Sequence, residues 1–293
     1  MNAHPLGLIA AIIVSTLCFS TGCQPPAPFR VMSFNIRNGT IDPPPNDWLS
    51  RRASVIATIR ENEPDIVGLQ EVIAQQADDI ALAFPEYHYF GVGNMDGADG
   101  GEADPILARR DRFNYIQDGY FWLSDAPSIP GSVGWDARYP RLVSWLKLSF
   151  KSNPNFVLLV LNTHLDHVGT EARLHSAEMI RRLTDSYAGT PIVVIGDFNC
   201  EWGDPPHAVL VKQEGNLAEL RDAFSAKARR GTFEENFDGV DDGRRIDHIL
   251  HSRRVITLSA DIDDKTHNGR YASDHFPVVA DLKVTPVSDS GAW

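Results

Sequence analysis

The sequence predicts one α/β domain whose sheets are covered on both faces. Two stretches, FVLLVLNTHL at 156–165 and PIVVIGDFN at 191–199, are apolar on both faces of an expected strand until polar residues appear near their ends. Strands of this kind are typical of sheets buried on both sides. Amphipathic helical patterns lie between the strands, and neither an internal repeat nor a linker follows residue 29. A single domain over 29–284 is therefore expected, followed by a short tail at 285–293.

The first half of this domain has clear strand and helix signals. Strands are predicted at 29–37, 65–71, 106–109, 113–122 and 142–150. A helix is predicted after Asp47, a suitable N-cap, because Leu49, Ala53, Ile56 and Ile59 follow at helical spacing. A second, shorter helix is expected at 73–83. The acidic, glycine-rich segment 94–104 is expected to be a solvated loop, since its oxygen ligands lack the register of a calcium loop.

The second half predicts two more helices and the last strands. Over 170–187, one side of a helix would carry Leu174, Ala177, Ile180, Leu183 and Tyr187. A short helix is expected near 206–213. The segments RRIDHILHS, VITLSADI and FPVVADLKV are predicted to form the final strands.

The first 28 residues predict export. LGLIAAIIVSTLCF at 6–19 is shorter than a membrane span and resembles the apolar region of a secretory signal peptide. STGC, followed by QPPAP, resembles the lipobox of a bacterial lipoprotein. We therefore expect a signal peptide at 1–22, a Pro-rich linker at 23–28, a lipid anchor on Cys23, and a periplasmic or cell-surface location. An ordinary cleaved signal stays open, because no Lys or Arg precedes the apolar run and Ser20 replaces the usual Leu.

Cysteine content and charge narrow the function. If Cys18 leaves with the signal and Cys23 is acylated, Cys200 is left alone and no intramolecular disulfide is expected. The net charge of −12 repels polyanions and disfavours a broad nucleic-acid-binding face. A local basic pocket remains compatible with this charge.

Several predicted strands end in, or lie next to, carboxylate, carboxamide or imidazole groups. These residues are Asn35, Glu71, Asn162, His164, Asp197, Asn199, Asp247, His248, Asp274 and His275. Any one of them has an ordinary structural explanation, but turns do not require a glutamate and several histidines at strand ends. If the ends converge on one rim, the mixture suits Mg²⁺. Zinc is less well supported, because neither an HExxH helix nor a Cys/His ligand spacing occurs.

Six of these segments together resemble a known family. SFNIR, DIVGLQEV, NTHLDH, IGDFN, RIDHIL and SDHFPV occur in the order and approximate spacing of the endonuclease/exonuclease/phosphatase superfamily, over about residues 29–284. YFWLS and GWDARYPR further resemble a bacterial subgroup described as metal-dependent hydrolases. The resemblance implies a four-layered αββα sandwich, the deoxyribonuclease I-like fold, with the active site at one edge.

The resemblance also implies roles at a metal site. Glu71 would be the principal ligand of Mg²⁺ or Mn²⁺, and Asn35 and Asp274 would either bind the ion or support its ligands. Asp197 would orient and deprotonate the attacking water. Asn199 would hold that water or the phosphate.

Further residues would contact the substrate. His164 and His275 would donate to the phosphoryl oxygens, and Asp247 would accept from His275 and raise its pKa. The expected substrate-binding residues are Arg37, Arg141 and Asn162. Each arginine would either clamp a phosphate or form a surface ion pair, and both interpretations stay open. Trp135 and Tyr139 could stack on a base or sugar, whereas Trp122 is expected mainly to pack in the core.

The sequence favours an exported phosphoesterase that hydrolyses phosphate mono- or diesters by in-line attack of an activated water. The substrate would be a phosphate ester, possibly a nucleotide or oligonucleotide, and no protein partner is expected. One alternative is an extracellular nuclease, which the acidity and the lack of disulfides disfavour. Another is a sphingomyelinase-like lipid phosphodiesterase, for which the loop 124–137 offers few apolar residues. A non-catalytic binding protein on the same fold is the last, and the full set of reactive residues disfavours it.

Overall fold

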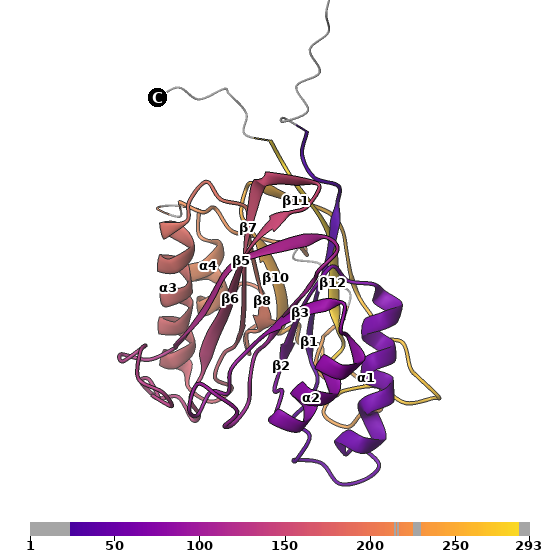
Figure 1. Ribbon diagram of the computed structural model, residues 1–293. Helices are drawn as coiled ribbons and strands as arrows, with labels where there is room; N and C mark the ends of the chain where they lie inside the picture. The colour runs from indigo at the N-terminus through magenta and orange to yellow at the C-terminus, as the bar shows by residue number, and fades with distance from the viewer. Residues whose placement is uncertain (1–23, 214, 216, 225–229, 287–293) are drawn as a thin grey trace, which may run out of the picture.

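Two six-stranded sheets pack face to face in the computed structural model, which describes residues 24–213, 215, 217–224 and 230–286 (Figure 1). The predicted signal peptide at 1–22, Cys23 and most of the predicted tail at 285–293 lie outside the described residues. No helix in the described part of the chain is long and apolar enough to cross a membrane. Cys200 is buried and not in a disulfide there.

The first sheet has the strand order β11-β12-β1-β2-β4-β3. Its strands are β1 (Phe29–Asn35), β2 (Ile66–Gln70), β3 (Tyr87–Phe90), β4 (Ile106–Arg109), β11 (Val255–Ile262) and β12 (Val278–Val284). Helices α1 (Trp48–Asn62) and α2 (Ala74–Ala83) cover its outer face (Figure 1).

The second sheet has the order β5-β6-β7-β8-β10-β9. Its strands are β5 (Phe113–Trp122), β6 (Leu142–Phe150), β7 (Asn153–His164), β8 (Ile192–Asp197), β9 (Arg221–Asp222) and β10 (Asp247–His251). Helices α3 (Thr170–Ser186) and α4 (Pro205–Val211) cover its outer face, so the predicted four-layered αββα sandwich is confirmed (Figure 1).

The central strands are apolar on both faces because each face enters a different core. In β8, Val193 and Ile195 point into the core between the sheets, whereas Ile192 and Val194 pack under α3 and α4. Successive side chains of a strand alternate between faces, so a strand with a core on each side needs apolar residues throughout.

The predicted strands and helices are present, with small corrections. In α1 the buried face carries Trp48, Val55 and Ile59, whereas Leu49, which we expected to face the core, is 65% exposed. The buried stripe therefore begins one residue earlier, where the Trp48 indole packs in the core and donates from Nε1 to Asp79. The short strands β3 and β9, of four and two residues, were not predicted.

Strand direction brings the polar strand ends to one rim. β1 and β2 are parallel, so Asn35 and Gln70 end side by side, and in the second sheet β7 and β8 are parallel, so His164 pairs with Asp197. β10 runs antiparallel to β8 and begins at the same rim, with Asp247 opposite Asp197. The sheets approach closely at Gly68, where a Cβ atom would lie 2.4 Å from Cδ1 of Ile195.

Candidate active site

A cleft of about 970 Å³ opens at this rim between the two sheets. Most of the predicted site residues line it, namely Arg37, Glu71, Arg141, His164, Asp197, Asn199 and His275. Asn35, Asp247 and Asp274 lie behind this lining and contact it, as described below.

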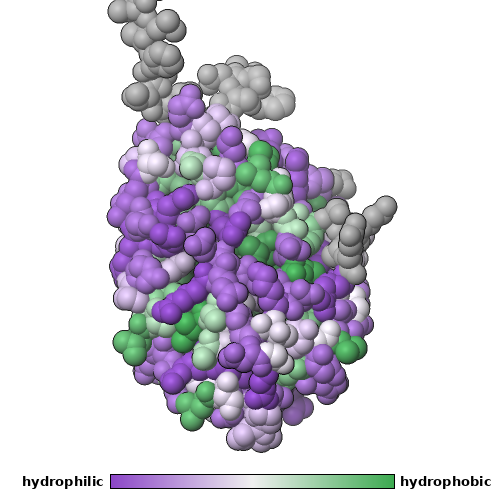
Figure 2. Space-filling view, turned by 90° about the vertical axis from the view of Figure 1, so that its right-hand side faces the viewer, coloured by the Kyte–Doolittle hydropathy of each residue, from purple (hydrophilic) through white to green (hydrophobic). Residues whose placement is uncertain are grey.

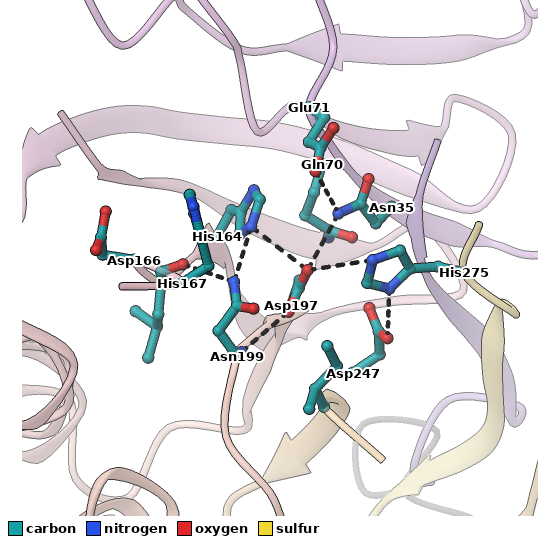
Figure 3. Close-up of polar contacts among 12 residues, drawn as sticks. Asn35, Gln70, Glu71, His164, Asp166, His167, Asp197, Asn199, Asp247 and His275 are labelled. Carbon is teal, nitrogen blue, oxygen red and sulfur yellow. Dashed lines mark hydrogen bonds and ion pairs between the residues drawn. The ribbon is translucent and has the colours of Figure 1, made fainter. Parts of the chain in front are cut away.

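Asp197 lies at the centre of the cluster, where the backbone that follows it and Asn35 of the other sheet hold its carboxylate (Figure 3). Its Oδ1 accepts from the backbone N–H of Asn199 at 2.9 Å, and its Oδ2 accepts from Nδ2 of Asn35 at 3.1 Å. Strand β8 needs glycine at 196, just before Asp197, since φ is +154° and a Cβ atom there would lie 2.0 Å from the carbonyl oxygen of Thr163. An apolar strand therefore carries a fixed carboxylate at its tip.

His275 connects two carboxylates (Figure 3). Its Nδ1 donates to Oδ2 of Asp247 at 2.9 Å, and its Nε2 lies 3.7 Å from Oδ2 of Asp197. Burial lowers the pKa of this imidazole, but the charges of Asp247 and Asp197 outweigh burial and raise the pKa to about 10. Burial and the charge of Asp247 raise the pKa of Asp197 to about 7. The arrangement favours a cationic imidazole beside a carboxylate of elevated basicity.

His164 is the neutral counterpart of His275. Its Nε2 lies 3.0 Å from Nδ2 of Asn199 and 3.4 Å from Oδ2 of Asp197, and its Nδ1 has no hydrogen-bond partner among the described residues. Burial, then the positive charge of Arg141, hold the pKa of His164 well below its ordinary value. His164 and His275 therefore differ in charge near neutral pH.

Glu71 and Asp274 bring further carboxylates to the rim. Glu71 has a positive φ of 63°, accepts from Nδ2 of Asn35 at 3.0 Å and accepts from the backbone N–H of Asn38 at 2.8 Å. Asn35 therefore orients both Glu71 and Asp197, while its own Oδ1 accepts from the N–H of Arg37. In this geometry Asn35 supports the carboxylates rather than offering a free oxygen.

Arg37 lies among these acids. Its Nη1 is 3.1 Å from Oδ2 of Asp274, and its Nε donates to Asp42 at 2.9 Å. Burial lowers the pKa of this guanidinium, but the bond to Asp42 and the charge of Asp274 outweigh burial, and the pKa is raised overall. Arg37 thus lines the cleft and is ion-paired, while the phosphate-clamp role stays a prediction.

The donor set fits a hard divalent cation. Glu71 and Asp274 offer carboxylate oxygens, the ligands that Mg²⁺ prefers. Burial raises the pKa of Asp274, and the negative charge of Glu71 raises it further against the opposing charges of His275 and Arg37. A cation beside Glu71 and Asp274 would relieve this repulsion.

A second arrangement of possible ligands fits a cation less well. Asp197, Asp247 and His275 present ligand atoms within 4.8 Å of one another. The Nδ1 of His275 already donates to Asp247, however, and the raised pKa of the imidazole disfavours the neutral form that binds metals.

A buried polar cluster beneath the second sheet is structural. His207 lies 3.0 Å from Oδ2 of Asp222, and Nη2 of Arg245 donates to the same oxygen at 2.8 Å. His248 donates from Nε2 to the carbonyl oxygen of Cys200 at 2.9 Å. Oδ2 of Asp222 already contacts His207, Arg245 and His248, so this carboxylate is satisfied without a metal ion.

Asn162 does not reach the cleft, contrary to the substrate-binding role expected of it. Its side chain is 0% exposed, and its Nδ2 donates to the carbonyl oxygens of Leu69 at 2.7 Å and Pro105 at 2.9 Å. Its Oδ1 accepts from Nε2 of Gln70 at 2.8 Å. Asn162 lies two residues before His164 on the same face of β7. Its side chain satisfies polar groups between the two sheets and does not reach the cleft.

The loop after β5 brings Tyr139 to the cleft but not Trp135, although both were expected as aromatic contacts for substrate. Tyr139 lines the cleft and is 46% exposed, as an aromatic contact for substrate requires. Trp135 instead stacks on His175, with ring centroids 4.6 Å apart. Trp122 is buried, as expected, and donates to the carbonyl oxygen of Asn94.

Two acidic residues that the sequence analysis passed over organise the cleft. Asp166 accepts from the backbone N–H groups of Arg138, Tyr139, Val168 and Gly169. Glu102 lines the cleft and accepts from Nδ2 of Asn38 at 2.8 Å, so segment 94–104 is not merely a solvated loop. Asp166 lies in the motif NTHLDH, and Glu102 lies four residues before the predicted strand at 106–109; these positions were their only signals in the sequence.

The family model described as the endonuclease/exonuclease/phosphatase family matches residues 32–275. None of the curated proteins matches this chain. Among solved structures, a family protein of Bacteroides thetaiotaomicron is 33% identical, covers 89% of this chain and 99% of its own, and has a TM-score of 0.82.

Two further solved structures extend the comparison. A mannosyl-6-phosphatase of B. thetaiotaomicron is 32% identical over 87% of this chain and 99% of its own, with a TM-score of 0.79. The catalytic domain of human nocturnin is 20% identical over 88% of this chain and 95% of its own, with a TM-score of 0.70, and shares the fold. With the family model matching most of the sequence, the chain belongs to the endonuclease/exonuclease/phosphatase family.

Proposed function

We propose that the protein is an Mg²⁺- or Mn²⁺-dependent phosphatase that hydrolyses a phosphate monoester of a small molecule. The observation that carries the proposal is the buried arrangement of Asp197, His275 and Asp247 beside the carboxylates of Glu71 and Asp274. A base, a cationic donor and hard oxygen ligands at one rim are the groups that attack of water on phosphorus requires. The 32% identical mannosyl-6-phosphatase supports a monoester.

In the proposed reaction Asp197 accepts a proton from the attacking water as the water oxygen bonds to phosphorus. The bond from phosphorus to the ester oxygen breaks, and the leaving group departs as an alcohol after taking a proton from solvent. Its two oxygens are fixed by Asn199 and Asn35, so the carboxylate meets the water without reorienting. His275, kept cationic by Asp247, donates from Nε2 to a phosphoryl oxygen as charge develops there. A bound divalent cation supplies Lewis-acid stabilisation of the phosphoryl group.

The cleft supports a small substrate. A volume of about 970 Å³ suits a small-molecule ligand and exceeds what a phosphate group alone would fill. Glu71 and Glu102 line this cleft, and the chain carries a net charge of −12, so a polyanionic duplex would be repelled. The nuclease alternative therefore receives less support than a phosphatase.

The test compares substrates on the full-length chain with added Mg²⁺ or Mn²⁺. Glucose 6-phosphate and p-nitrophenyl phosphate represent monoesters, bis-p-nitrophenyl phosphate represents diesters, and a single-stranded oligonucleotide and sphingomyelin vesicles represent the alternatives. We expect turnover of the monoesters to exceed that of the other substrates. In Asp197→Asn, turnover should fall by about 10²- to 10⁴-fold, since the amide cannot accept the proton.

Thermal melting of Asp197→Asn is the control for folding. Faster hydrolysis of the oligonucleotide than of the monoesters would overturn the monoester proposal in favour of a nuclease. Full turnover by a folded Asp197→Asn variant would remove Asp197 from the reaction.

A further inference from the structure

One side of the cleft contains polar groups that the proposed reaction does not use. Asn38, Glu102, Tyr139, Arg141 and His167 line this region, which we call the Arg141 subsite. Together they present a carboxylate, a guanidinium, an amide and an aromatic ring to one part of the cleft.

Glu102 and Arg141 face each other without a direct hydrogen bond. Oε2 of Glu102 lies 3.6 Å from Nη1 of Arg141, a separation longer than a hydrogen bond. Oε1 of Glu102 already accepts from Asn38 at 2.8 Å, which fixes the carboxyl group and leaves Oε2 towards the arginine. An acceptor and a donor are thus held side by side.

One nitrogen of the Arg141 guanidinium lacks a hydrogen-bond partner although the residue is buried. The residue is 5% exposed, yet its Nε has no hydrogen-bond partner among the described residues, and Oδ2 of Asp166 is 3.8 Å away. Its Nη2 lies 3.3 Å from Nδ1 of His167. A buried guanidinium with unused donors in a cleft is suited to a ligand, because unpaired buried donors are costly.

Tyr139 provides a surface next to this pair. Its ring stacks on His167, with centroids 5.8 Å apart and an interplanar angle of 28°. The backbone N–H of Tyr139 donates to Asp166, which fixes the loop that carries the ring. Because the ring is partly exposed, it offers an apolar face and a hydroxyl to a ligand in the cleft.

The charges of the subsite indicate a neutral ligand. Glu102 and Asp166 both face Arg141, so two carboxylates accompany one guanidinium. A second phosphate group at this position would meet these carboxylates. A hydroxyl group instead can donate to Oε2 of Glu102 and accept from Nη1 of Arg141, the two atoms that face each other at 3.6 Å.

Another basic residue at the cleft, Arg244, is less suitable for binding a ligand. Arg244 also lines the cleft, but its side chain is 51% exposed and its Nε donates to Asp242 at 2.6 Å. An exposed arginine with a carboxylate partner has little left to offer a ligand. The organised contacts therefore lie on the Arg141 side.

We propose that the Arg141 subsite binds hydroxyl groups of a polyhydroxylated leaving group, so that the preferred substrates are phosphate monoesters of sugars or related polyols. This inference rests on the proposed phosphatase function, which supplies the position of the phosphate. Glu102 accepts from one hydroxyl, Arg141 donates to the same or a neighbouring hydroxyl, and Tyr139 packs against the C–H face of the ring. None of these three residues takes part in the attack on phosphorus.

The test uses Glu102→Gln in the full-length chain, which keeps the size of the side chain and removes its charge. Glucose 6-phosphate and mannose 6-phosphate carry ring hydroxyls, whereas p-nitrophenyl phosphate carries none beyond the phosphate. We expect kcat/KM for the hexose phosphates to fall about tenfold or more, mainly through KM, because a charge-assisted hydrogen bond is lost. The value for p-nitrophenyl phosphate should stay within about twofold. Glu86→Gln, an exposed change outside the cleft, is the matched control.

A second measurement does not depend on turnover. Calorimetric titration of mannose 6-phosphate into Asp197→Asn, with and without Glu102→Gln, should show a Kd about tenfold weaker in the double variant. Equal losses for all substrates, or no loss for any, would overturn the subsite, and so would binding that is indifferent to Glu102. Glu102-dependent binding by a chain without any phosphatase activity would support the subsite and reject the proposed function.

Discussion

The charge of His275 depends on two carboxylates that lie on either side of its ring. Asp247 accepts from Nδ1 at 2.9 Å, and Asp197 lies 3.7 Å from Nε2. Burial alone would keep this imidazole neutral, but the two negative charges raise its pKa to about 10, and Asp197 has a pKa raised to about 7. The proposed reaction needs ionised Asp197 and protonated His275, so kcat/KM should rise as pH passes about 7 and fall as pH passes about 10.

Asp247→Asn should shift this profile to lower pH. Removing the charge of Asp247 withdraws a stabilisation of the imidazolium, which lowers the pKa of His275, and removes a repulsion that raises the pKa of Asp197. The alkaline limb of kcat/KM should move down by more than about one pH unit, and the acid limb should also move down. The profile is measured with p-nitrophenyl phosphate from acid to alkaline pH. An unchanged alkaline limb would remove His275 from the pH dependence.

At the scale of secondary-structure elements, the contact between the two sheets positions the rim. Gly68 of β2 permits the close approach to Ile195 of β8, and Asn162 of β7 satisfies polar groups of the first sheet from the second. Because Asn35 and Asp197 come from different sheets, their 3.1 Å bond depends on this approach.

Asn162→Ala should therefore destabilise the fold without removing a substrate contact. The carbonyl oxygens of Leu69 and Pro105 and the amide of Gln70 would each lose one hydrogen bond, at a cost of about 3 kcal/mol in the free energy of unfolding. Asn155→Ala, at an exposed position of the same strand, is the control, and urea unfolding measures both. Below the unfolding transition KM should remain within about twofold of the wild type. A large rise in KM with unchanged stability would restore the substrate-binding role.

These elements also explain how much of the site the sequence could predict. Asp197 and His275 were recognisable because each belongs to a local motif at the end or beginning of a strand. Asn162 belongs to a similar motif, but its side chain bonds to the other sheet two positions before the strand end. That contact depends on how the two sheets pack, which the sequence does not show. Glu102 was missed because its contacts to Asn38 and Arg141 join segments far apart in the chain.

At the scale of the whole molecule, the net charge disfavours polyanionic substrates, and the cleft lies away from the described ends of the chain. The chain has a net charge of −12, and the face in Figure 2 is mostly hydrophilic, with hydrophobic residues in small separate groups. β1 pairs with β12 near both ends of the described chain and runs from there towards the rim that carries the cleft (Figure 1). The cleft thus lies at the end of the sheets remote from the described ends of the chain.

The proposed function requires this rim to hold a catalytic divalent cation through Glu71. The most direct measurement is steady-state turnover of p-nitrophenyl phosphate by the metal-stripped, full-length chain as Mg²⁺ is added, for the wild type and for Glu71→Gln. We predict no turnover without the ion, saturable activation with it, and half-activation of Glu71→Gln at a concentration about tenfold higher or more. Turnover that is independent of added and residual metal would rule out a catalytic cation. Activation of Glu71→Gln at the wild-type concentration would rule out Glu71 as its ligand.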